Sequence, residues 1–136
     1  MSLEKSKDKD KKKQACKVLL ASQSQAYRNN LASTMRMQGY DVEFAHGGFH
    51  LLHLLENEID NNFNIIILHE NLEDMSAYEV ISLVRLNKTK TELPVIFISR
   101  DSQEVVISEM LSVEANDYII QTPAYGPVIN AAKKYC

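Results

Sequence analysis

Short apolar runs and helical apolar stripes alternate along this chain from Lys17 to its end. Five runs have the length and composition of strands, at residues 18–21, 41–45, 65–68, 94–98 and 117–120. The run at 65–68 is continuously apolar, as is typical of a strand covered on both faces. Apolar positions spaced for helices follow these runs, at residues 27–35, 49–55, 78–84, 105–111 and 128–132. This alternation predicts an α/β fold with a doubly wound, five-stranded parallel sheet.

Glycine and proline punctuate this pattern where the elements should begin or end. Gly39 is well placed to end the first helix, and Pro94 stands at a strand start, where no ladder hydrogen bond is lost. The pair Gly47-Gly48 lacks a phosphate-loop pattern, so we interpret it as a strand-to-helix turn.

Length and composition favour a single globular domain. The chain has 136 residues, of which 45% are apolar and 24% are charged. No apolar run approaches the roughly 20 residues of a membrane span, so no membrane partner is expected. Cys16 and Cys136 form neither a disulfide framework nor a metal-ligand motif, so we expect reduced thiols and a cytoplasmic protein.

The net charge of −3 is unevenly distributed. Residues 1–14 hold six lysines and three acids, and the remainder holds nine basic and fifteen acidic residues. Because the head lacks apolar periodicity, residues 1–16 are predicted to be a flexible lysine-rich leader and residues 17–136 the folded domain. The acidic domain is not expected to bind nucleic acid.

Polar residues follow the predicted strands at their carboxyl ends. Ligands of open parallel sheets bind outside these ends. The most informative residue is His69, an imidazole directly after the third apolar run. The other loops bring to the same edge Ser22 to Ser24, Glu70, Asn71, Ser99, Arg100 and Gln121 to Pro123. The sequence therefore predicts a candidate site centred on His69.

Four segments fit motifs of one family. They are Arg28, Leu31, Met35, Gly39, Tyr40 and Val42 (R-x-x-L-x-x-x-L-x-x-x-G-Y-x-V), Leu72, Asp74 and Met75 (L-P-D-M-D-G), Pro94 to Ser99 (P-V-I-x-x-[TS]), and Ala115 to Tyr118 (A-D-D-Y). On these residues the chain resembles the receiver domain of two-component response regulators. The resemblance implies a (βα)5 flavodoxin-like fold and a role in phosphorelay-type signal transduction. Glu114 stands where the family usually has glycine, so the turn before the last strand is expected to be altered.

The resemblance also implies that the family's phosphorylation pocket is degenerate here. Its acidic pair falls on Ser22 and Gln23, its phosphoaccepting aspartate on His69, and its lysine on Gln121; its hydroxyl residue is kept as Ser99. Ser22, Gln23 and His69 offer no anionic oxygen to Mg²⁺, a hard ion that prefers carboxylates. We therefore expect that Mg²⁺ binding is lost and that the protein has no cofactor.

Glu70 is not expected to replace the missing aspartate, because it would point to the opposite sheet face if the strand continued past His69. Acyl-phosphate chemistry would then lack both its nucleophile and its charge neutralisation. The sequence thus predicts a pseudo-receiver that is not an enzyme and acts as a protein-interaction module. The resemblance implies a kinase or output protein as partner, bound through the fourth helix, fifth strand and fifth helix, where Tyr118 keeps the family's switch aromatic. Homodimerisation is left open.

Alternatives remain at the same edge. The chain could be a response regulator with a substitute phosphoacceptor, His69 or Ser99. His69 could also be a metal ligand or a pH switch, although a hydrogen-bonded structural histidine is the simpler interpretation. A small flavodoxin-like ligand binder is less favoured, because the crevice has neither a glycine-rich phosphate loop nor a carboxylate pair.

Overall fold

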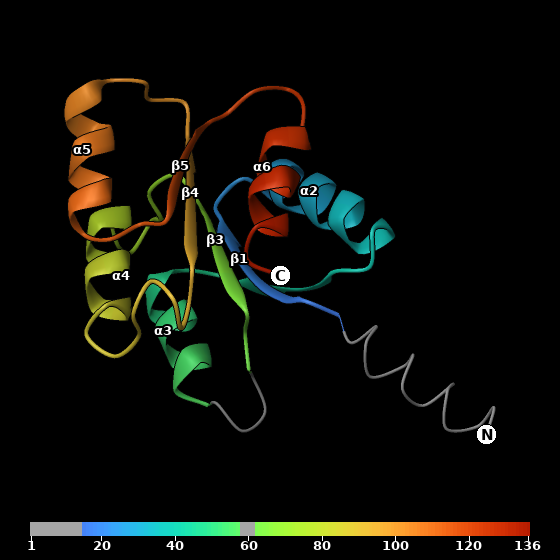
Figure 1. Cartoon of the computed structure of the whole chain (residues 1–136), viewed down its shortest axis with the longest axis horizontal. Coiled ribbons are helices and arrows are strands. Elements are labelled where there is room, and N and C mark those ends of the chain that lie inside the picture. Colours follow the sequence, from blue (N-terminus) through green and yellow to red (C-terminus); the bar gives the residue numbers. More distant parts are fainter. Residues whose placement is uncertain (1–14, 58–61) are drawn as a thin grey trace.

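Five parallel strands form the sheet at the centre of the fold (Figure 1). Their order in the sheet is β2-β1-β3-β4-β5. This computed structural model describes residues 15–57 and 62–136. The strands are β1 (Lys17–Ser22), β2 (Asp41–Ala45), β3 (Ile65–His69), β4 (Val95–Ser99) and β5 (Asp117–Ile120). The predicted doubly wound sheet is confirmed, and each expected strand lies within a residue or two of its observed bounds.

Helices cover both faces of the sheet (Figure 1). They are α2 (Gln25–Met37), α3 (Gly48–Glu56), α4 (Ala77–Val84), α5 (Glu104–Ser112) and α6 (Gly126–Lys133). Buried side chains of α2 and α6 share one apolar cluster, whereas those of α3, α4 and α5 share the other. The fold therefore has three layers, with the sheet in the middle.

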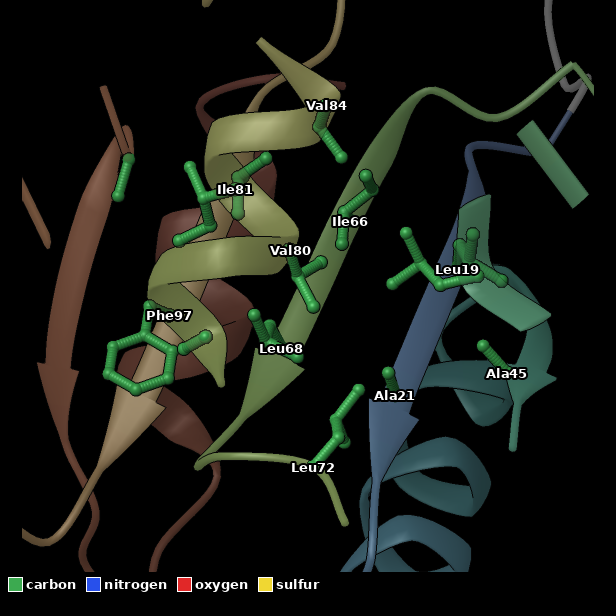
Figure 2. Close-up of a cluster of buried hydrophobic side chains, with 14 of the residues drawn as sticks. Leu19, Ala21, Ala45, Ile66, Leu68, Leu72, Val80, Ile81, Val84 and Phe97 are labelled. Atoms are coloured by element: carbon green, nitrogen blue, oxygen red, sulfur yellow. The ribbon is translucent and has the colours of Figure 1, made fainter. Parts of the chain in front are cut away.

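The central strands are apolar up to their polar end residues, because their side chains enter both clusters. In β3, Ile66 and Leu68 face α3 to α5, whereas Ile65 and Ile67 face α2 and α6. Figure 2 shows the cluster beneath α3 to α5, where Val80 and Val84 of α4 lie on the side of β3 and Ile81 lies toward Phe97 of β4. Side chains of successive strand residues point to opposite faces, so a strand covered twice needs an apolar residue at every position.

Gly47 and Gly48 form the predicted turn from β2 into α3. Gly47 is the N-cap residue, and the Asp74 carboxylate accepts hydrogen bonds from the backbone N–H groups of Gly48 (2.8 Å) and Phe49 (3.1 Å). A Cβ at Gly48 would lie 2.5 Å from Met75 Sδ. The motif residues Asp74 and Met75 thus pack against this turn, and position 48 leaves room only for glycine.

Arg85 ties together the irregular segments around the amino ends of β4 and β5. Its guanidinium donates to the carbonyls of Lys88, Thr89, Leu93 and Glu114 and to Asn116 Oδ1. Glu114, at the position usually held by glycine, adopts the left-handed conformation with φ 67°. The turn before β5 is therefore made in a conformation that costs a non-glycine residue free energy.

The two ends of the described chain meet beside the sheet. Cys16, just before β1, and Cys136, just after α6, form a disulfide with a Cα–Cα distance of 5.8 Å. The expectation of two reduced thiols is therefore wrong for this structure: the path of α6 returns the C-terminus to the start of β1. Residues 1–14 of the predicted leader lie outside the described residues. Within residues 15–57 and 62–136, no helix has the length and hydropathy of a membrane span.

Candidate functional site

An open cleft of about 380 Å³ lies at the carboxyl ends of the strands, where the sequence placed the site. Four loops line it, through Gln23, Ser24, His69, Glu70, Asn71, Arg100 and Gln121. Pairing of β1 with β3 sets Ser22 beside His69. Ser22, His69 and Ser99, the buried polar residues of the described chain, all lie at this edge.

His69 is the centre of a chain of hydrogen bonds. Its Nδ1 lies 2.7 Å from Ser22 Oγ, and its Nε2 lies 2.7 Å from Gln121 Oε1. An amide oxygen only accepts, so Nε2 carries the proton. Nδ1 then accepts from the Ser22 hydroxyl, whose contact with Nδ1 at 2.7 Å is much shorter than its contact with the Ser24 carbonyl at 3.4 Å. Ser22 Oγ also accepts from the Ser24 backbone N–H at 3.1 Å. Both ring nitrogens of the neutral imidazole are thereby satisfied.

The environment of His69 also favours its neutral form. The side chain is only 5% exposed, and burial lowers its pKa below the ordinary value; a hydrogen bond to Gln121 and the charge of Glu70 oppose this shift. Removing a positive charge from water costs free energy unless an anion compensates for it. Here the direct partners are a hydroxyl and an amide, so the histidine stays uncharged at neutral pH.

Tyr27 covers the imidazole. Its ring stacks on that of His69 with centroids 3.9 Å apart and an interplanar angle of 14°, and Tyr125 meets Tyr27 edge-on at 5.6 Å. Burial, with a smaller contribution from Tyr125, raises the pKa of Tyr27 to about 12, so this residue is also neutral. The helical pattern predicted Tyr27 to be buried, but sequence reasoning missed its place in the site.

Glu70 differs from its expected position. β3 ends at His69, and Glu70 adopts a left-handed φ of 60° that turns its side chain toward β4. Its carboxylate accepts from Ser99 Oγ and the Arg100 backbone N–H, both at 3.2 Å. The cleft therefore does contain an anionic oxygen. The strand alternation that would have turned Glu70 to the opposite face ends at His69 and does not extend to Glu70.

The remaining predicted site residues take separate places. Ser99 binds Glu70 and the backbone N–H of Asp101 rather than His69, and Gln23 lies exposed at the rim. Tyr118 lies away from the cleft, where its ring contacts Phe97 and its hydroxyl donates to the Asp101 carbonyl at 2.6 Å. In the described residues, no group of three or more His, Cys, Asp or Glu side chains is arranged to hold a metal ion.

Comparison with known proteins gives a consistent result. The family described as "Response regulator receiver domain" matches residues 18–124. The chain is 24% identical over 107 residues to the chemotaxis protein CheY homolog of Campylobacter jejuni, covering 77% of this chain and 80% of that protein.

Solved structures show the same fold. The chemotaxis response regulator CheY4 of Vibrio cholerae superposes with a TM-score of 0.79 at 20% identity, covering 90% of this chain and 99% of that chain. A probable two-component system response regulator/GGDEF domain protein superposes with a TM-score of 0.81 at 19% identity, covering 90% of this chain and 49% of the other.

Proposed function

The chain belongs to the response regulator receiver domain family, and from this premise we propose that it acts in two-component signal transduction as a phosphorylation-independent protein-interaction module. The observation that carries the proposal is the neutral hydrogen-bonded chain through Ser22, His69 and Gln121. These residues stand where the family resemblance places an acid, the phosphoacceptor and the lysine. The proposal assigns no enzymatic activity to the domain.

His69 is poorly suited to accept a phosphoryl group. A nucleophile needs a free lone pair facing the incoming phosphorus. The lone pair of Nδ1 is directed at the Ser22 hydroxyl, Nε2 carries its proton toward Gln121, and Tyr27 covers one face of the ring. Phosphorylation of His69 would have to break this arrangement in a side chain that is 5% exposed.

The donors of the cleft do not fit Mg²⁺. This ion prefers octahedral oxygen coordination that includes carboxylates. The Ser22 hydroxyl is engaged with His69, and the single carboxylate, from Glu70, already accepts hydrogen bonds from Ser99 and Arg100. We therefore propose that the domain works without Mg²⁺ or another cofactor, and no chemical step is routed through a metal.

The interaction surface in this proposal consists of α5, β5 and α6. α5 and β5 expose the apolar side chains of Val105, Leu111 and Ile120. Tyr118 on β5 donates a hydrogen bond to the carbonyl of Asp101, in the loop between β4 and α5. A change in the position of this loop would therefore also change the surface of β5. A kinase or output protein that recognises this surface is the proposed partner, in a cytoplasmic setting.

Phosphorylation with acetyl phosphate and Mg²⁺, followed by intact mass measurement, tests the proposal. We expect no adduct on the natural chain. A fourfold variant with Ser22→Asp, Gln23→Asp, His69→Asp and Gln121→Lys is the matched control and is expected to gain one phosphate. An adduct of one phosphate on the natural chain would overturn the proposal, and its loss in Ser99→Ala or His69→Gln would identify the substitute acceptor.

A further inference from the structure

The disulfide lies at the opposite end of the sheet from the cleft, where the proposed signalling mechanism does not use it. Cys16 is half-buried and Cys136 is exposed. Both line an open hollow of about 630 Å³, together with Lys17, Asp41 and Tyr135 among others. In the described part of the chain the disulfide thus lies at the surface, where we expect a small thiol to reach it while the protein is folded.

The bond fastens the end of α6 to the start of the sheet. Cys136 is joined covalently to the residue before β1, and two neighbours bind Asp117 at the start of β5: Tyr135 through its hydroxyl at 2.5 Å and Lys134 through its amine at 3.0 Å. The Lys134 side chain is 56% exposed, and an exposed ion pair adds little stability. The disulfide is thus the strongest link between this end of α6 and the sheet.

α6 depends on such links. It has only eight residues, and an isolated helix of this length is not stable in water. Its apolar side chains contact the sheet over Val128 to Ala132, and its last residues rely on the anchors at Asp117 and Cys16. Breaking the disulfide removes the covalent link at this end of the helix. What remains there is the packing of Ala131, Ala132 and Tyr135, and the contacts of Tyr135 and Lys134 with Asp117.

We propose that Cys16 and Cys136 form a reversible redox clasp on α6. Exposed disulfides are more readily reduced than buried ones, so a bond at the surface is suited to forming and breaking while the protein is folded. Oxidation by a small-molecule disulfide removes two electrons and two protons from the cysteine thiols. The sulfur–sulfur bond forms as that of the oxidant breaks, and the oxidant leaves as two thiols. Reduction reverses these steps through a mixed disulfide.

Because α6 is part of the proposed interaction surface, the state of the disulfide would affect that surface. This consequence rests on the proposed function, whereas the clasp itself does not. The test below measures the disulfide and the mobility of α6, and it uses neither phosphate nor a partner. Its outcome is therefore independent of the test of the proposed function.

The test uses the full chain equilibrated in buffers of reduced and oxidised glutathione. Trapping thiols with iodoacetamide and measuring intact mass gives the oxidised fraction, and hydrogen–deuterium exchange of the same samples reports on residues 126–133. We expect the folded protein to change between dithiol and disulfide across these buffers. In the dithiol form, amides of α6 should exchange at least about tenfold faster, while amides of β3 keep their rates.

A double variant, Cys16→Ser and Cys136→Ser, should show the fast exchange of α6 in every buffer. Reduction of the natural protein removes the disulfide without a substitution. The test therefore remains valid even if the double variant misfolds. The proposal is overturned if the cysteines stay reduced in oxidised glutathione, if the bond breaks only when the protein unfolds, or if α6 exchanges equally in both forms.

Discussion

Replacing His69 by alanine tests whether this residue is a structural element rather than a reactive centre. The change removes hydrogen bonds of 2.7 Å to Ser22 and to Gln121 and a ring stacked at 3.9 Å on Tyr27. A net intramolecular hydrogen bond contributes about 1 kcal/mol, and an aromatic pair contributes about 0.5–1.5 kcal/mol beyond its buried area. The three contacts together predict a loss of about 3 kcal/mol in the free energy of unfolding.

Such a loss raises the equilibrium constant for unfolding by roughly 100-fold. Urea unfolding followed by circular dichroism measures it directly. His53→Ala is the matched control, because His53 lies exposed on α3 and its replacement should change the free energy of unfolding by no more than about 0.5 kcal/mol.

A double-mutant cycle with Ser22→Ala isolates the bond to Nδ1. The two substitutions should be less destabilising together than their sum, with a coupling energy of about 0.5–3 kcal/mol. The structural interpretation of His69 would be refuted if His69→Ala cost no more than His53→Ala, or if the cycle showed no coupling.

Three further perturbations follow from the structure. Because burial lowers the pKa of His69, the unfolded state takes up its proton more readily, so the free energy of unfolding should fall as the pH drops below about 6.5; an equal pH slope in His69→Gln would contradict this. Glu114→Gly should stabilise the protein in urea by about 1 kcal/mol, because Glu114 has φ 67°, and a loss of stability would show that this backbone carries no cost. Gly48→Ala should destabilise it by about 1–3 kcal/mol through collision with Met75, whereas Gly126→Ala, with no atom within 4 Å, serves as the control; equal melting temperatures would count against the predicted clash.

The fold was predictable because two periodicities in the sequence report burial directly. A continuous run such as Ile65 to Leu68 needs cover on both faces, and the observed layers supply it. The place of His69 followed from the same pattern, since a polar residue after a buried parallel strand must lie at its carboxyl end.

Features that depend on how elements meet were not predictable in this way. The helical position of Tyr27 indicated burial, but not that its ring would cover an imidazole 42 positions later in the chain. Glu70 left the strand through a backbone rotation that alternation cannot foresee. The pairing of Cys16 with Cys136 spans 120 positions and depends on where α6 brings the chain back to the sheet.

Arg85 has a consequence for local opening of the structure. Its guanidinium binds carbonyls in the segment after α4, and its partner Asn116 also accepts from the Val95 backbone N–H and donates to the Lys90 carbonyl. Opening of the segment between α4 and β4 would therefore break hydrogen bonds that also hold Val95 and Asn116, at the starts of β4 and β5. A stretch without regular structure would usually exchange its amides independently, but here we expect it to open together with the starts of two strands of the sheet.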